Sequence, residues 1–283
     1  MNAGGKTFQL TKDNSEWKIT KPLQVRADYG TVEGLIGRLQ TAVMKSIVAD
    51  EASAADLKKY GLDKPAVSLD LTIGSARATL VLGAKAGENA VYGRDTSKGM
   101  VVTVDSSLAD ELKKGADDYP RKDVFEFRAY NANHVEIFRN GQTVVFDKVK
   151  EPAKDGKDGA EKWRRVSPNA GDADKDKMDT LLSRLSNMRA SSFVDATAKT
   201  GLNQPAMTVV AKFDENKKEE RVTFGKVDAD VYAARPNEPG AMKVEATDFT
   251  EANKTLDELS SNPNRTGAQK RLPSPRSGRV SAA

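Results

Sequence analysis

Few residues in this sequence have the types and spacing that chemistry requires. His134 is the single histidine and cysteine is absent, so a Ser-His-Asp triad would have to use His134, and cysteine-ligated zinc is excluded. The sequence contains no Gly-x-Ser-x-Gly segment that would present a serine nucleophile. His134 stands at the entrance of a predicted strand, and this position favours a turn or surface role. The sequence therefore predicts no catalytic residue.

Three aspartates at alternate positions are typical of the opening of a calcium-binding loop: Asp172, Asp174 and Asp176. However, Lys177 stands where that loop needs glycine, and Ser183 stands where it needs a bidentate glutamate. Acidic residues are also favoured at a helix N-terminus, and a helical pattern follows. We therefore expect helix capping here and no metal site.

The segment Gly5-Lys6-Thr7 resembles the end of a phosphate-binding loop. That loop also needs a glycine five positions earlier, a preceding strand and a following helix. Here the segment leads into a strand pattern, so we expect no nucleotide and no other cofactor.

Aromatic residues offer two further candidates for binding. Trp17 and Trp163 could stack on sugars or bases, but each ends a hairpin strand, where a core residue belongs. Two strand tyrosines each have an arginine nearby, and together these residues could form a polar binding groove; ordinary sheet surface is the alternative. The four residues are Tyr92, Arg94, Tyr232 and Arg235.

The elements that would position these residues follow from hydrophobic periodicity and turn chemistry. Residues 7–20 predict a β-hairpin with a turn at Asp13-Asn14-Ser15. A helix capped by Asp28 or Thr31 is expected to extend to Ile47. A short helix from Ser53 ends at Gly61. The following segments are predicted strands: Val67–Ile73, Ala78–Leu82 and a run from Ala90 to Val104 with a turn near residues 96–99. A short helix begins at Ser106 or Ser107.

A second series of elements follows in the same order. Asn140-Gly141 predicts a hairpin turn between the strands Val135–Phe138 and Thr143–Phe146. Residues 150–161 predict a polar loop. The apolar positions of an amphipathic helix are Met178, Leu181, Leu182, Leu185 and Met188.

The two series share phrases at nearly fixed spacing. Tyr60-Gly-Leu-Asp-Lys-Pro65 returns as Thr200-Gly-Leu-Asn-Gln-Pro205, each followed by alternating apolar residues. The residues that mark the repeat are Trp17, Trp163, Gly61, Pro65, Gly201 and Pro205. This pattern predicts an α+β protein of two tandem repeats, each an antiparallel β-sheet with one long amphipathic helix and short helices. We expect the first repeat at residues 1–118, with a truncated N-terminus, and the second at residues 119–260.

Charge is concentrated in the C-terminal tail. The chain of 283 residues has 38% hydrophobic and 30% charged residues and a net charge of +4, which is typical of a soluble globular protein. Residues 261–283 carry basic and no acidic side chains and almost no apolar ones, so we expect a disordered tail. It could bind nucleic acid or an anionic membrane, but it lacks interleaved aromatics, so we expect a linker and no nucleic-acid partner.

The repeated phrases resemble a known bacterial family, domain-of-unknown-function family 4340. The similarity rests on Trp17 followed by Pro22, on Ala27-Asp28, on Tyr60-Gly-Leu-Asp-Lys-Pro65, and on the later strands ending at Gly83 and containing Tyr92. It is strong in the first repeat and weaker in the second, where Thr200 and Asn203 replace Tyr and Asp.

The resemblance implies a function and a location. Proteins of this family typically have an N-terminal membrane anchor and an extracytoplasmic body, and are often encoded beside ABC-type transport components similar to gliding-motility auxiliary proteins. The resemblance therefore implies a non-enzymatic binding or scaffold module with membrane transport-complex subunits as partners. It places this module at the extracytoplasmic face of the inner membrane or in the periplasm, attached through an anchor missing here. The alternatives are a cytoplasmic location and a hydrolase of envelope polysaccharide or peptide that uses carboxylates between the lobes.

Overall fold

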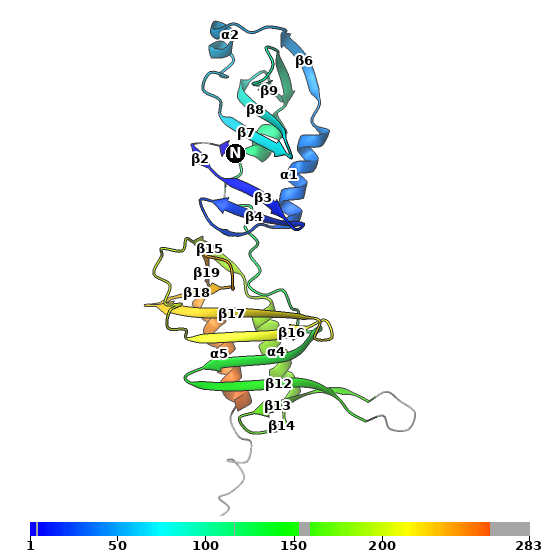
Figure 1. The fold of residues 1–283 in the computed structure, drawn as a ribbon, viewed down its shortest axis with the longest axis vertical. Coiled ribbons are helices and arrows are strands. Elements are labelled where there is room, and N and C mark those ends of the chain that lie inside the picture. The colour runs from blue at the N-terminus through cyan, green and yellow to red at the C-terminus, as the bar shows by residue number, and fades with distance from the viewer. Residues whose placement is uncertain (4, 116, 153–158, 261–283) are drawn as a thin grey trace, which may run out of the picture.

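The computed structural model describes residues 1–3, 5–115, 117–152 and 159–260. Within these residues the chain forms five helices and three antiparallel sheets, so the expected α+β class is confirmed. Figure 1 shows two masses stacked along the long axis of the molecule. We call residues 1–118 the N-terminal half and residues 119–260 the C-terminal half. The predicted tail and residues 153–158 of the predicted polar loop lie outside the described residues.

The N-terminal half contains a seven-stranded sheet in the order β2-β1-β7-β8-β9-β10-β6 and a three-stranded sheet in the order β3-β4-β5. Its elements are β1 (Asn2–Ala3), β2 (Lys6–Thr7), β3 (Gln9–Asp13), β4 (Glu16–Lys21), β5 (Val25–Arg26), α1 (Tyr29–Thr41), β6 (Met44–Ala49), α2 (Ala54–Lys59), β7 (Val67–Ile73), β8 (Ala76–Lys85), β9 (Ala90–Asp95), β10 (Val101–Asp105) and α3 (Ser106–Leu112).

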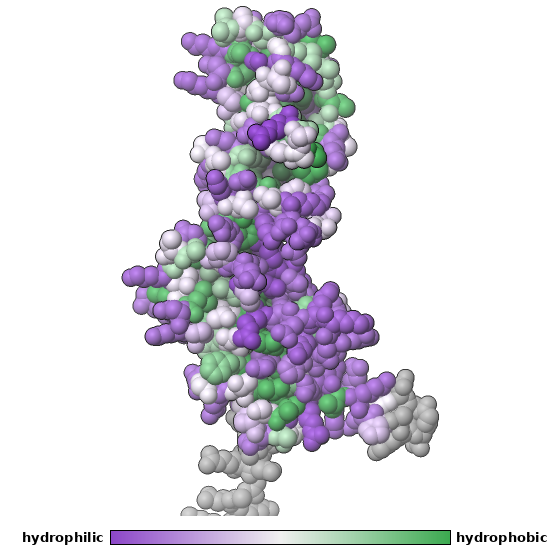
Figure 2. Space-filling view, viewed as in Figure 1, coloured by the Kyte–Doolittle hydropathy of each residue, from purple (hydrophilic) through white to green (hydrophobic). Residues whose placement is uncertain are grey.

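The C-terminal half contains one nine-stranded sheet in the order β14-β13-β12-β11-β16-β17-β18-β19-β15. Helices α4 and α5 pack against each other on one face of this sheet (Figure 1). Over this half, the face seen in Figure 2 is mainly hydrophilic with scattered apolar residues. The elements are β11 (Ala132–Arg139), β12 (Gln142–Lys150), β13 (Glu161–Ser167), β14 (Gly171–Asp172), α4 (Lys175–Ser186), β15 (Ala190–Val194), β16 (Met207–Phe213), β17 (Lys218–Val227), β18 (Asp230–Ala234), β19 (Ala241–Val244) and α5 (Ala246–Ser260).

Most predicted elements form for the expected local reasons. The β3–β4 turn places Asn14 and Ser15 at φ 46° and 70°, and the β11–β12 turn uses Asn140 and Gly141 at φ 50° and 74°. Asn-Gly turns favour these left-handed conformations, which match the twist of paired strands, and asparagine also tolerates them at position 14. Ser53 forms a capping box at the start of α2.

One predicted helix boundary is wrong. Helix α1 ends at Thr41, and residues 44–49 form strand β6, which pairs with β10. Val43 and Ile47 continue the helical period in the sequence, yet they are 71% and 54% exposed. The β-branched residues of this segment favour a strand once β10 offers a pairing partner. Tertiary pairing therefore overrides the local periodicity.

Helix α5 was not predicted, although its sequence carries a helical pattern. Phe249, Ala252, Leu256 and Leu259 follow spacings of three and four residues, and all four are buried against the nine-stranded sheet. Across the described residues, no helix is both long enough and apolar enough to cross a membrane.

Two glycines allow close approaches between backbone segments. A Cβ atom built at Gly83 would lie 2.9 Å from the carbonyl carbon of Gly61, and one built at Gly225 would lie 2.6 Å from that of Gly201. Gly61 and Gly201 have φ of 67° and 69°, which favour glycine. The Gly-Leu phrase of each half forms a corner, at Gly61 and at Gly201. A long strand, β8 or β17, passes this corner so closely that its own glycine, Gly83 or Gly225, has no room for a side chain.

Candidate functional site

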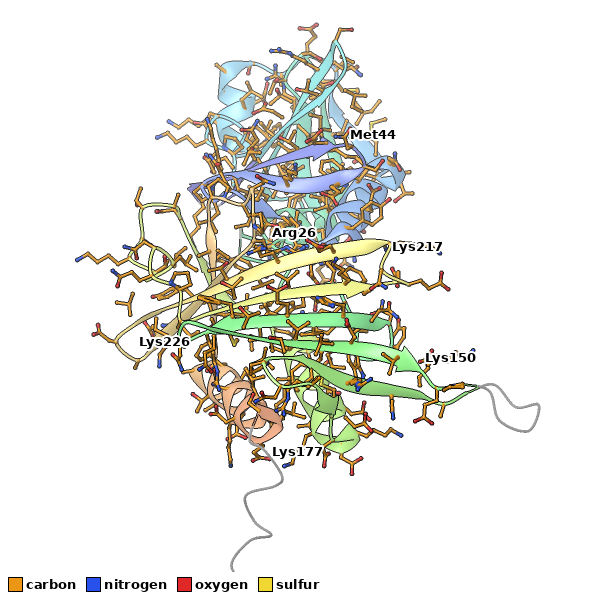
Figure 3. All side chains as sticks on the ribbon, turned by 60° about the horizontal axis from the view of Figure 1, so that its bottom comes forward. Arg26, Met44, Lys150, Lys177, Lys217 and Lys226 are labelled. Atoms are coloured by element: carbon orange, nitrogen blue, oxygen red, sulfur yellow. The ribbon has the colours of Figure 1, made fainter. Side chains whose placement is uncertain are left out.

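A group of linked charges lies where the two halves meet. Arg26 comes from β5 of the N-terminal half, and Figure 3 labels it between the strands of the two halves. The other half supplies four residues: Glu126 from the connecting segment (residues 119–131, which precede β11), Glu220 from β17, and Arg235 and Glu238 from the loop between β18 and β19. We call these five residues the junction cluster.

Arg26 is the contribution of the N-terminal half to the junction cluster. Its Nη1 donates a hydrogen bond to Glu126 Oε1 at 2.6 Å. Its Nε lies 2.6 Å from Glu238 Oε1, but the Nε–H is not directed at an acceptor, so this contact is an ion pair without an aligned hydrogen bond. Burial lowers the pKa of the Arg26 guanidinium from its ordinary value, and Glu238 opposes that shift. The side chain is 11% exposed.

Glu220 organises the other side of the junction cluster. Its carboxylate accepts hydrogen bonds from the backbone N–H groups of Glu126 and Phe127, at 2.9 and 2.8 Å. It also accepts one from Arg235 Nη1 at 2.6 Å. With a side chain only 2% exposed, Glu220 needs these partners, because an unpaired buried carboxylate is strongly unfavourable.

The backbone also joins the halves. The Asp28 N–H donates to the Tyr119 carbonyl at 2.7 Å, and the Arg121 N–H donates to the Arg26 carbonyl at 2.9 Å. The Gly240 N–H donates to the Gln24 carbonyl at 3.4 Å. The connecting segment therefore binds the start of α1, and the β18–β19 loop binds the residue before β5.

Apolar packing continues across the same contact. Phe193 on β15 packs against the hydrophobic cores of both halves. A Cβ atom at Gly240 would lie 2.9 Å from Val25 Cγ1, so this loop needs glycine to approach β5. The β15 end of the C-terminal half thus rests on the β5 end of the N-terminal half, and ion pairs, hydrogen bonds and packing all hold the contact.

The arrangement is suited to fixing geometry. Glu126 contacts both Arg26 and Arg235, at 2.6 and 3.1 Å. Glu220 and Glu238 also contact arginines. Carboxylates committed to guanidinium groups hold their positions but are not free for a substrate. We therefore regard the junction cluster as a structural joint.

The structure separates the four residues of the predicted groove. Tyr92 and Arg94 lie on β9, where Tyr92 packs on Tyr60 with ring centroids 4.4 Å apart, and Arg94 Nε donates to the Lys98 carbonyl at 2.9 Å. Tyr232 and Arg235 belong to the other half, where Arg235 enters the junction cluster. The two tyrosine–arginine pairs therefore lie in different halves and do not form one groove.

The tryptophans lie in comparable settings. Trp163 is 6% exposed and belongs to the C-terminal core, and Trp17 packs partly buried against the N-terminal core. Lys148 and Lys12 lie over their rings at 5.5 and 5.3 Å. Each tryptophan therefore combines core packing with a cation–π contact.

The remaining candidates have local roles. His134 Nδ1 lies 2.6 Å from Asp147 Oδ1 on the neighbouring strand. Asp174 is the N-cap of α4 and accepts a hydrogen bond from the Lys177 N–H at 3.0 Å, as the capping interpretation requires. Asp172 pairs with Lys162. In the part of the chain that the structure describes, no three His, Asp or Glu residues are placed to hold a metal ion.

Sequence reasoning found only Arg235 of the junction cluster. A signal for Glu220 was present: in β17 it alternates with Val222 and Phe224, so the strand period places a charged residue at an inward position. An inward charge needs a partner, but the sequence gives no indication that the partner is Arg235 or that Glu126 lies beside it.

The fold and junction define a two-lobed α+β protein with antiparallel sheets. A family model described as domain of unknown function (DUF4340) matches residues 17–205 and, in an overlapping segment, residues 163–262. The chain belongs to this family. No curated protein and no solved structure matches the chain.

Proposed function

We propose that this chain is a non-enzymatic binding or scaffold module of a bacterial cell-envelope complex for ABC-type transport or a gliding-like process. The junction cluster carries this proposal. It links the two lobes through partly buried ion pairs, and a scaffold needs a fixed spacing between its binding surfaces. The envelope location, the transport-complex partners and the membrane anchor rest on the family's typical context and belong to the same proposal.

We further propose that the halves are tandem copies, residues 1–118 and 119–260. Strand order supports this. From β14 to β15 the C-terminal sheet reads β14-β13-β12-β11-β16-β17-β18-β19-β15. The N-terminal strands read β5-β4-β3, then β2-β1-β7-β8-β9-β10-β6. The two orders correspond if β2 and β3 together take the place of β12, and the Gly61 and Gly201 corners then coincide.

The test is mild crosslinking of the full-length tagged protein in native envelopes, followed by identification of what co-purifies. Recovery of ABC-type permease or auxiliary subunits is expected. Recovery of no membrane partner, with the protein in the cytoplasmic fraction, would overturn the proposal.

The enzyme alternative is an envelope hydrolase that uses the carboxylates between the lobes. Glu126, Glu220 and Glu238 do converge there, and hydrolysis would require one of them to be released from its arginine. Turnover of an envelope polymer that the Glu126→Gln variant loses while remaining folded would favour the hydrolase. The scaffold proposal predicts no turnover by either protein.

A further inference from the structure

Strand β6 presents an apolar sheet edge. It is the last strand of the seven-stranded sheet, so one side of its backbone has no neighbouring strand within the described residues. Residues 42–47 are all exposed, with Met44 at 50% and Ile47 at 54%. Figure 3 shows Met44 in the N-terminal half, away from Arg26 and the junction. An exposed apolar edge strand is a template for pairing with another chain segment.

Strand β15 has the position in the C-terminal sheet that β6 has in the N-terminal sheet, on the internal duplication proposed above. Both strands pair antiparallel with the strand that precedes the last helix of their half, and both have a register irregularity near their start. The equivalent pairs are Met44 with Val104 and Ala190 with Val244, then Ile47 with Val102 and Phe193 with Met242. Met44 thus corresponds to Ala190, and Ile47 to Phe193.

In the C-terminal half this edge is covered. An extended segment, residues 122–124, runs antiparallel to the chain entering β15. The Val124 N–H donates to the Met188 carbonyl at 3.1 Å, and the Ala190 N–H donates to the Lys122 carbonyl at 2.8 Å. Met188 and Ala190 are only 1% and 5% exposed. Their counterparts in the N-terminal half, Ala42 and Met44, are exposed.

The covering segment also contributes to the core. Val124, Phe125 and Phe127 are fully buried in the cluster that contains Val244. Beside the uncovered β6 edge there is instead a cavity of about 160 Å³. Its lining residues are Arg38, Thr41, Ala42, Val43, Val104, Asp105, Ser107 and Leu108.

We propose that the β6 edge binds an extended segment of a partner protein that pairs antiparallel with residues 42–44 and carries bulky apolar side chains spaced as in Val124-Phe125-Glu126-Phe127. The backbone hydrogen bonds supply affinity, and the cavity beside Val43 receives an apolar side chain. This mode of binding gives the scaffold a defined attachment strand. The inference rests on the proposed duplication and deepens the proposed function.

The probe is a labelled peptide with the sequence of residues 119–128, measured by fluorescence anisotropy with the purified chain. Saturable binding is expected. Met44→Asp should weaken it about tenfold or more, because a charge would be buried beneath the added strand. Ile73→Asp is the matched control: Ile73 is an 81% exposed residue at the end of β7, and its variant should bind as the unaltered chain does.

Three results of the peptide assay would overturn the inference. They are no saturable binding of the peptide, equal binding by Met44→Asp, and equal binding of a peptide in which serine replaces Val124, Phe125 and Phe127. Light scattering of the purified chain is expected to show a monomer; a dimer that Met44→Asp dissociates would make a second copy the occupant and also overturn it. Recovery of membrane partners in the envelope crosslinking without peptide binding would reject this inference and leave the proposed function standing.

Discussion

Arg26 and Glu126, which are 100 residues apart in the chain, are joined by a hydrogen bond in which Nη1 donates to Oε1 at 2.6 Å. The two residues belong to different halves of the molecule. Glu126 Oε1 also lies 3.1 Å from Arg235 Nη2, and the Glu126 backbone N–H donates a hydrogen bond to the Glu220 carboxylate. One guanidinium group therefore connects the N-terminal half to a network that is already assembled in the C-terminal half.

Removing the Arg26 guanidinium should destabilise the protein strongly. Arg26→Met leaves Glu126 and Glu238 with Arg235 as a remaining partner, but it removes a charged hydrogen bond and an ion pair across the halves, at a cost on the order of 2 kcal/mol. Urea unfolding measures this loss. The control is Arg189→Met, because Arg189 is 61% exposed in its pair with Asp123 and should contribute under about 1 kcal/mol. Equal losses in the two variants would contradict a structural joint at Arg26.

Gly225, which lies against the Gly201 corner of the C-terminal half, should not tolerate a side chain. Gly225→Ala would place Cβ 2.6 Å from the Gly201 carbonyl carbon, and such overpacking costs about 1–3 kcal/mol. Gly34→Ala is the control: Gly34 is exposed in α1 with no atom within 4 Å of a built Cβ, and alanine there should stabilise by about 0.5–1 kcal/mol. Thermal unfolding of both variants tests this contrast, and a stabilised Gly225→Ala would refute the close approach.

Tyr119 should make stability fall at high pH. Its side chain is 0% exposed, its hydroxyl has no hydrogen-bond partner within the described residues, and burial raises its pKa to about 12 from 10.0. The folded state therefore keeps the proton after the unfolded state has released it, so this contribution is complete below pH 10 and is lost between pH 10 and 12.

Tyr119→Phe isolates that contribution. The variant should match or exceed the unaltered protein near pH 7, because a buried hydroxyl without a partner is unfavourable. Between pH 10 and 12, the unaltered protein should lose on the order of 2 kcal/mol more than the variant. Unfolding free energies measured across this range decide the matter, and identical pH slopes would rule out the raised pKa.

Asp28 caps α1 at the edge of the junction. Its carboxylate accepts hydrogen bonds from the Thr31 Oγ1 and backbone N–H, at 2.7 and 2.8 Å. The Thr31 hydroxyl is the main cause that lowers the pKa of Asp28 below 3.8. Asp28→Ala should cost about 1 kcal/mol at neutral pH, and Asp28→Asn much less, because asparagine also caps.

The pH dependence of this cap has a defined sign. A depressed folded pKa stabilises the protein above pH 3.8, and the contribution is lost as the pH falls through the folded pKa. The difference between the unaltered protein and Asp28→Ala should therefore shrink in acid. A difference that stays constant from pH 7 to pH 2 would show that the carboxylate charge does not contribute.

The sequence predicted elements governed by local chemistry and missed contacts set by tertiary pairing. The sequence predicts the turn at Asn140-Gly141 and the helix start at Ser53, because turn and cap preferences act within a few residues. Residues 43–47 were misread, because pairing with β10 decides their conformation. The junction cluster joins Arg26 to Glu238 across the halves, and no local pattern encodes such a contact.

The most direct test of the central claim, that the junction holds the two halves in one orientation, is a distance distribution between two spin labels. The chain has no cysteine, so spin labels attach only at the two introduced cysteines, Lys58→Cys on α2 and Asp179→Cys on α4, both at exposed positions. The measured distance is then the distance between the two halves. We predict one narrow distribution that broadens when Arg26→Met is added. A broad or multiple distribution in the otherwise unaltered chain would contradict the fixed joint, and with it the scaffold role built on it.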